Sequence, residues 1–181
     1  MKKILNTSIA LLLFITGSMF LTSCDSTPSP QKTFEIAALN SNLLSDFGSK
    51  QINRQLRSEP QVYDTANKKM IASTYYDYFK FQIADLENRY KNVEKIKVND
   101  DNRELLTASK DLFSYAITKE KEGYLPIAKM KDQKASPEDI QKAVTDFDAA
   151  TRNEIDTKFV SLMNTAKIYA KKNNINAKFG L

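Results

Sequence analysis

Residues 64–95 read DTANKKMIASTYYDYFKFQIADLENRYKNVEK. Apolar side chains recur in this segment at every third or fourth position, the spacing that gathers side chains on one face of an α-helix. These positions are Ala72, Tyr75, Phe79, Ile83, Leu86, Tyr90 and Val93. The pattern predicts one amphipathic helix over 64–95, and it is the clearest helical signal in the chain.

The segments on either side show the same period. Residues 33–57 form a first predicted helix, which ends before Pro60 because the residue preceding a proline is pushed out of helical geometry. Its apolar face consists of Ile36, Leu39, Leu43, Leu44 and Phe47. A third predicted helix follows the turn Asn99-Asp100-Asp101-Asn102, in which either aspartate can cap the helix. Gly123 and Pro126 are expected to kink or fray the end of this helix.

A fourth helix has the clearest boundaries. Ser136-Pro137-Glu138-Asp139 combines an N-cap residue, a first-turn proline and two acidic residues, a typical helix start. The period continues to about Lys172, where Lys171 and Lys172 suit the negative end of the helix dipole. Four long helices with short connections predict an all-α fold, an up-down-up-down four-helix bundle. The competing arrangement is a three-helix bundle with a peripheral first helix.

The N-terminus carries a different signal. Lys2 and Lys3 precede the apolar run Ile9–Ile15, which is interrupted soon afterwards by polar and small residues. A membrane-spanning helix needs about 20 apolar residues, so this shorter run is interpreted as a signal peptide. The chain then divides into a signal peptide (1–23), a flexible tether (24–32) and a helical-bundle domain (33–181).

Leu21-Thr22-Ser23-Cys24 resembles the lipobox of bacterial prolipoproteins. The resemblance implies that Cys24 becomes the first residue of the mature protein and receives the lipid. It also implies a location in the cell envelope, anchored to a membrane by that lipid. Asp25 resembles the inner-membrane retention signal of enterobacterial lipoproteins. It is equally consistent with an ordinary residue of the tether, so the choice between inner and outer membrane stays open.

The later helices and the segment Ala170-Lys171-Lys172-Asn173-Asn174 are similar to uncharacterised lipid-anchored helical surface proteins of bacteria. That resemblance implies no activity.

Removal of Lys2 and Lys3 leaves 25 of the 27 basic residues against 22 acidic ones. Such a mixed surface is unlike that of nucleic-acid-binding proteins, so we expect no nucleic-acid partner.

The sequence lacks most residues on which catalysis depends. It contains no histidine, and Cys24 is its single cysteine. Histidine-based catalytic triads and the usual zinc and haem ligands are therefore excluded, and we expect neither a cofactor nor an enzymatic activity. An enzyme that uses the carboxylates Glu120 or Glu154 alone is the least favoured hypothesis.

Two polar side chains fall on apolar helix faces. Glu120 lies in the apolar stripe of the third predicted helix, and Arg54 lies on the inward face of the first. We expect Arg54 and Glu120 to form a buried pair that fixes the register of the helices. The alternative is a functional site built on a carboxylate with a raised pKa.

The second predicted helix carries apolar residues outside its main stripe. Met70 and Phe81 lie on its polar side, and Tyr78 is close to them. These three residues form a candidate interaction patch, unless another part of the chain covers them. The leading hypothesis is therefore a lipid-anchored, non-catalytic interaction or structural protein with a protein partner. The alternative is a carrier of a small apolar ligand in the bundle interior.

Overall fold

The computed structural model describes residues 27–179. The predicted lipobox and Cys24, the predicted site of lipid attachment, lie outside the described residues. The fold is mostly helical and contains one small two-stranded sheet. The elements, in chain order, are α1 (Pro30–Ala37), a 3₁₀ segment (Leu39–Leu44), α2 (Ser49–Leu56), β1 (Gln61–Asp64), β2 (Lys69–Ala72), α3 (Tyr75–Glu94), α4 (Arg103–Lys119), a π-helical turn (Glu120–Tyr124), α5 (Leu125–Asp132) and α6 (Pro137–Lys172).

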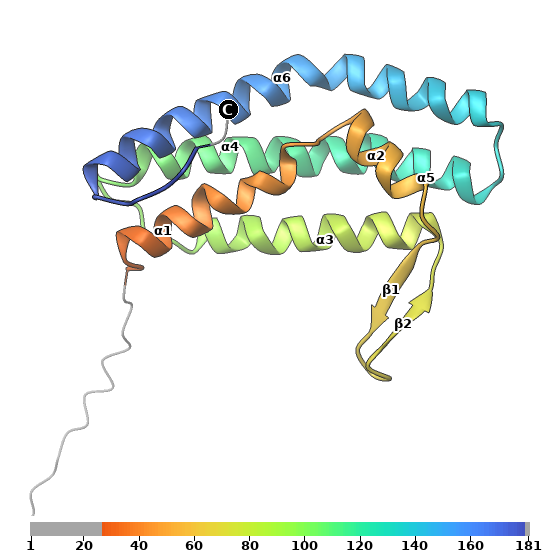
Figure 1. Cartoon of the computed structure of the whole chain (residues 1–181), viewed down its shortest axis with the longest axis horizontal. Coiled ribbons are helices and arrows are strands. Elements are labelled where there is room, and N and C mark those ends of the chain that lie inside the picture. The colour runs from red at the N-terminus through yellow and green to blue at the C-terminus, as the bar shows by residue number, and fades with distance from the viewer. Residues whose placement is uncertain (1–26, 180–181) are drawn as a thin grey trace, which may run out of the picture.

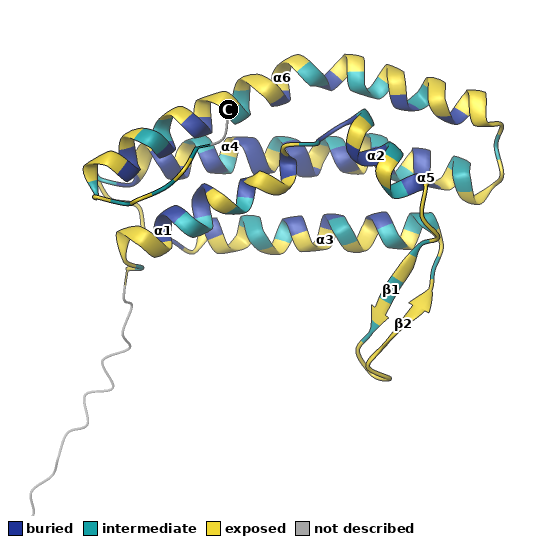
Figure 2. Ribbon diagram, in the orientation of Figure 1, coloured by how far each residue is buried: buried dark blue, intermediate teal, exposed yellow. Residues whose placement is uncertain are grey.

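Three long helical segments run side by side and enclose the core (Figure 1). They are α3, α6 and a continuous rod formed by α4 and α5. This rod contacts both α3 and α6. The N-terminal segment, from α1 to α2, lies across them, and α1 contacts α3, α4 and α6. Figure 2 shows the buried residues on the faces that these segments turn toward one another.

The first predicted helix is broken into three pieces. Gly48 interrupts it with a φ of +94°, which an L side chain rarely adopts. The intervening residues 39–44 form a 3₁₀ segment, whose three-residue turn rotates the apolar face away from the predicted one. Leu39 and Leu43 are exposed as a result, whereas Leu44 and Phe47 are buried as predicted.

The first helix also begins earlier than predicted. Its N-cap is Ser29, whose side chain accepts a hydrogen bond from the backbone N–H of Lys32, and Pro30 occupies its first turn. Residues 30–32 therefore belong to α1 rather than to the tether. A Ser-Pro pair thus starts α1 in the same way as it starts the fourth helix, with serine as the N-cap and proline in the first turn.

The second predicted helix is correct only from Tyr75 onward. Thr74 caps α3 by accepting a hydrogen bond from the N–H of Asp77. The preceding residues form an antiparallel hairpin, in which Val62 pairs with Ile71 and Tyr63 with Met70. The prediction of a helix over 64–74 is wrong because the apolar spacing in that part also fits two short strands around a turn.

The third predicted helix bends without fraying. The backbone N–H of Leu125 bonds to the carbonyl of Glu120, the five-residue spacing of a π-helix, and α5 continues from there. Neither aspartate of the preceding turn caps α4, because Asn102 occupies that position. Its side chain bonds to the backbone of Asn99 and Lys97 instead of to the helix.

The fourth helix agrees with its prediction at both ends. Ser136 caps α6 by accepting a hydrogen bond from Asp139 N–H, and the helix ends at Lys172. The residues that follow fold back over α1, where the ring of Phe179 meets that of Phe34 edge-on at 5.9 Å. None of the helices described between residues 27 and 179 is long and apolar enough to cross a membrane.

Candidate functional site

The buried carboxylate predicted on the third helix is present, but its predicted cation is not. Glu120 is only 2% exposed and accepts a hydrogen bond of 3.5 Å from Gln51 Nε2. Arg54 lies one turn further along α2, is exposed, and pairs with Asp46. The predicted pair of Arg54 with Glu120 is therefore wrong. The prediction brought the correct two segments together, but the break at Gly48 changes which side chain of α2 faces inward.

Burial controls the protonation of Glu120. Desolvation disfavours the charged carboxylate and raises its pKa to about 8, while the hydrogen bond from Gln51 acts in the opposite direction. The group is therefore mostly protonated at neutral pH. An uncharged carboxylic acid requires no cation, which accounts for the absence of one beside it.

Tyr124 extends this polar cluster. Its hydroxyl accepts a hydrogen bond of 2.8 Å from the backbone N–H of Gly48 and donates one of 3.2 Å to Gln51 Oε1. Burial, and secondarily the nearby Glu120, raises the pKa of the Tyr124 hydroxyl, so it stays protonated. A continuous hydrogen-bonded path thus runs from Gly48 through Tyr124 and Gln51 to Glu120.

Aromatic rings surround the path. The ring of Tyr124 lies 5.6 Å from that of Phe47, 5.7 Å from Phe79 and 5.3 Å from Phe147. Gly123, within the π-helical turn, allows the close approach of Phe147, because a Cβ at this position would lie 2.1 Å from that ring. Water is thus excluded from the polar cluster, which is the physical cause of the raised pKa of Glu120.

A second polar contact fixes the loop that contains Gly48. Asp148 on α6 accepts a hydrogen bond of 2.7 Å from Ser49 N–H and pairs with Arg152 at 2.6 Å. Arg152 in turn donates to the carbonyl of Phe47 at 2.6 Å. The loop before α2 is therefore held from both sides, by Tyr124 and by α6.

This cluster joins the N-terminal segment to the core through buried hydrogen bonds. Neither Glu120 nor Glu154 is among the residues that line the main surface hollows of the described chain. Glu154 is exposed and pairs with Lys158 at 3.0 Å. Within residues 27–179, no group of three or more acidic residues is arranged to hold a metal ion.

The candidate interaction patch falls on two different elements. Met70 lies on strand β2, and Phe81 lies on α3; each is 54% exposed, as predicted for a patch. Tyr78 is half-buried and packs against the core, so it contributes less surface than predicted. The sequence interpretation missed two further exposed side chains of the hairpin, Ile71 (39% exposed), which it placed in a helix, and Tyr63 (49% exposed), which lies just before that predicted helix.

A hollow of about 510 Å³ lies beneath the hairpin. Met70 and Tyr78 line it, together with residues of α2, but Phe81 does not. Gln55 also lines it, and its Oε1 atom is buried and has no hydrogen-bond donor within the described chain. A buried acceptor without a donor is unfavourable.

A smaller hollow of about 260 Å³ lies between α1, α6 and the C-terminal tail. Phe34, Phe159, Met163 and Phe179 supply much of its apolar lining. It lies at the surface and is separate from the bundle interior, where the rings around Tyr124 are packed together.

No protein-family model matches the chain, and comparisons with curated proteins and with solved structures give no match. No relative therefore supplies an activity or a partner by analogy. The function proposed below rests on the residues and geometry of this chain.

Proposed function

We propose that this chain is a lipid-anchored, non-catalytic protein of the cell envelope that works by binding another protein. In this proposal its helices form an up-down-up-down four-helix bundle, interrupted in its first member, which serves as a scaffold. The contact surface is the hairpin β1–β2, together with the exposed Phe81 of α3. The observation that carries the proposal is the apolar exposure of this hairpin, which extends away from the helices (Figure 1).

The hairpin has the features of a docking element. Tyr63 and Met70 are directly paired and share one face, so their exposed side chains form a continuous apolar surface. The sheet contains two strands within the described chain, which leaves both outer edges without a paired strand. An isolated hairpin is only marginally stable in water, and an extended segment of a partner would stabilise it by adding a third strand.

The hollow beneath the hairpin favours the same kind of partner. A strand laid along the hairpin could cover Met70, which lines the hollow and is half exposed. We therefore propose an extended peptide segment of a protein as the occupant of this surface.

Membrane attachment belongs to the proposal through Cys24, which lies outside the described residues. Mass spectrometry of the mature N-terminus is expected to find an acylated Cys24. The Cys24→Ala variant is expected to leave the membrane fraction. A wild-type protein that carries a free Cys24 thiol in the soluble fraction would refute the anchor.

Site-specific photo-crosslinking tests the contact surface. A photoreactive phenylalanine analogue is placed at Tyr63, Met70 or Phe81 in the full chain, expressed in its native cells. We expect one adduct of the same mass at all three positions, and we expect unlabelled excess protein to suppress it.

Ile168 on α6 provides the matched control, because it is also apolar and is 63% exposed. The analogue at Ile168 is expected to give no adduct of that mass. Equal adducts at Ile168 and at the hairpin would mean that the contact is non-specific, and no adduct at the hairpin would remove the proposed surface.

The apolar hollow beside Phe179 favours a second candidate function, transport of a small apolar ligand. Its volume of about 260 Å³ is near the lower end for ligand pockets. A neutral fluorescent probe such as N-phenyl-1-naphthylamine should bind the wild type more tightly than a Met163→Lys variant if this function holds. Identical titrations for the two proteins would exclude it.

A further inference from the structure

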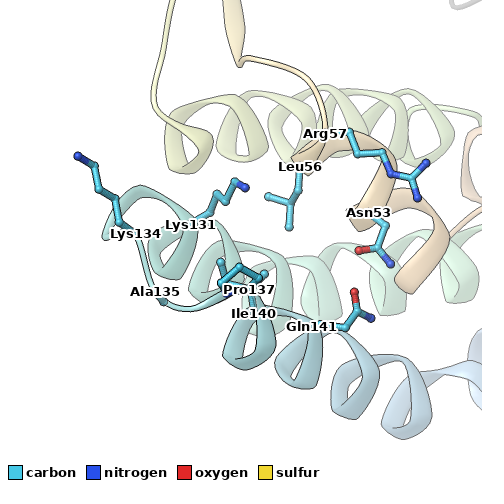
Figure 3. A pocket seen from close by; sticks show the side chains of 9 residues that line it. All are labelled: Asn53, Leu56, Arg57, Lys131, Lys134, Ala135, Pro137, Ile140 and Gln141. Atoms are coloured by element: carbon cyan, nitrogen blue, oxygen red, sulfur yellow. The ribbon is translucent and has the colours of Figure 1, made fainter.

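A further hollow at the surface of the described chain is lined by residues at the end of α2, in α5 and at the start of α6. Its volume is about 540 Å³, and it separates α2 from the corner between α5 and α6 (Figure 3). Leu56 and Ile140 are buried side chains that form its apolar part. This volume is ordinary for a small-molecule site.

Charge distinguishes this hollow from the others. Arg57, Lys131 and Lys134 line it, and none of the lining residues is acidic. None of the three forms an ion pair within residues 27–179, whereas Arg54, one turn earlier on α2, pairs with Asp46. The ammonium group of Lys131 lies 5.7 Å from the ring of Tyr75, a contact that leaves its positive charge uncompensated.

Figure 3 shows how these side chains are placed. Lys131 extends toward Leu56 and the hollow, whereas Lys134 points away from it. The amide groups of Asn53 and Gln141 point toward one another across the gap between α2 and α6. Arg57 extends away from Lys131, so that the two cations lie on opposite sides of Leu56 and the two amides lie on the Arg57 side. These groups come from segments far apart in the sequence.

We infer that this hollow binds a phosphate monoester attached to a small apolar group. A phosphate monoester carries nearly two negative charges at neutral pH, which Arg57 and Lys131 can balance. The guanidinium fork of arginine matches phosphate oxygens with two parallel hydrogen bonds. The amides of Asn53 and Gln141 supply further donors, and the apolar part of the ligand packs against Leu56 and Ile140.

The ligand chemistry has two sources, a soluble phosphate monoester or phosphatidic acid, a phospholipid whose headgroup phosphate is itself a monoester. The inference is independent of the protein-binding proposal, because the hairpin and this hollow share no lining residue.

Isothermal titration calorimetry of the full chain in a non-ionic detergent tests the inference. The probes are butyl phosphate, inorganic phosphate, butanol and hexanoate. We expect butyl phosphate to bind most tightly and butanol not to bind. Arg57→Gln and Lys131→Gln are each expected to weaken butyl phosphate binding about tenfold, the usual effect of losing one charge-assisted contact.

Two variants serve as matched controls. Arg54→Gln removes a nearby cation that is paired with Asp46, and Lys134→Gln removes one that points away; both are expected to change the affinity less than twofold. Circular dichroism spectra identical to that of the wild type would show that all variants are folded. Equal affinities of the wild type and the Arg57→Gln, Lys131→Gln double variant would overturn the inference, as would butanol binding as tightly as butyl phosphate.

Vesicles distinguish the two sources. Sedimentation with vesicles of phosphatidic acid and phosphatidylcholine, compared with phosphatidylcholine alone, is carried out on the wild type and the double variant. Binding to phosphatidic acid that the double variant loses identifies a lipid headgroup. Tight binding of butyl phosphate without such vesicle binding identifies a soluble ligand. Failure to bind either overturns the inference.

Discussion

The phenolic hydroxyl of Tyr124 accepts a hydrogen bond of 2.8 Å from the backbone N–H of Gly48, and this bond joins the π-helical turn to a loop 76 residues earlier in the chain. Both groups are buried, so neither can turn to water when the other is removed. The same hydroxyl donates to Gln51, which in turn reaches Glu120. One side chain therefore connects the N-terminal segment to the polar cluster of the core.

Replacement of Tyr124 by phenylalanine tests this connection. The Tyr124→Phe variant keeps the packed ring but leaves the Gly48 N–H without its acceptor. We expect its free energy of unfolding to fall by about 1–3 kcal/mol, measured by urea denaturation. Tyr63→Phe removes an exposed hydroxyl and should change that free energy by less than about 0.5 kcal/mol. Equal midpoints for the two variants would show that the bond contributes nothing.

Gly48 itself should tolerate no side chain. Its φ is +94°, and an added Cβ would lie 2.1 Å from Asp148 Oδ1. The Gly48→Ala variant therefore combines backbone strain with a steric clash, and we expect it to lose at least about 2 kcal/mol of stability in urea denaturation. Ser45→Ala, at an exposed position nearby, is the control. A Gly48→Ala variant as stable as this control would contradict the assigned loop conformation.

The pKa of Glu120 predicts how stability depends on pH. The group is protonated in the folded protein up to about pH 8, whereas in the unfolded chain it ionises near its ordinary value of 4.5. The stability that this raised pKa contributes to the folded protein is therefore fully present below pH 4.5, and it is lost as the pH rises to about 8. The difference between 4.5 and about 8 corresponds to roughly 5 kcal/mol.

The Glu120→Gln variant cannot ionise and should lack this dependence. We expect it to match the wild type near pH 4.5 and to be the more stable protein at pH 8, in urea denaturation across that range. Glu122→Gln alters an exposed carboxylate two residues away and should follow the wild-type curve. A Glu120→Gln variant that is less stable at every pH would indicate a charged, paired carboxylate.

Phe81 and Phe79 are neighbours on α3 with opposite environments. Phe81 is 54% exposed, whereas Phe79 is 0% exposed. We expect Phe81→Ala to cost less than about 1 kcal/mol of stability and Phe79→Ala about 3–5 kcal/mol. Thermal or urea denaturation separates these values easily. A large loss for Phe81→Ala would assign Phe81 to the fold and remove it from the contact surface.

The elements that local sequence determines were predicted well. Both ends of α6 follow from residues in direct contact with them, Ser136 at the start and Lys171 and Lys172 at the end. The helical period of α3 also matches the structure, since Phe79, Ile83, Leu86 and Val93 are buried. In these elements the capping residues and the apolar spacing agree, and one arrangement satisfies both.

The remaining elements depend on contacts between distant residues. The π-helical turn adds one residue to a helix where Gly123 meets Phe147, and periodicity alone carries no sign of that contact. The predicted partner of Glu120 was Arg54, whereas the observed partner is Gln51, for a similar reason. Tyr124 holds Gly48, and the break at Gly48 turns a different face of α2 toward Glu120. The hairpin did leave a signal, in the runs Val62-Tyr63 and Met70-Ile71 on either side of a polar turn.

The contact between Phe34 and Phe179 has a mechanical consequence. Tension applied at the start of α1 reaches this ring pair within the first turns of the helix, before it reaches the three long helices. The contacts of α1 with its neighbours lie close to the point where the force enters, so they yield one after another and open only part of the molecule. We therefore expect the N-terminal segment to detach first under load, while α3, α4 and α6 stay folded.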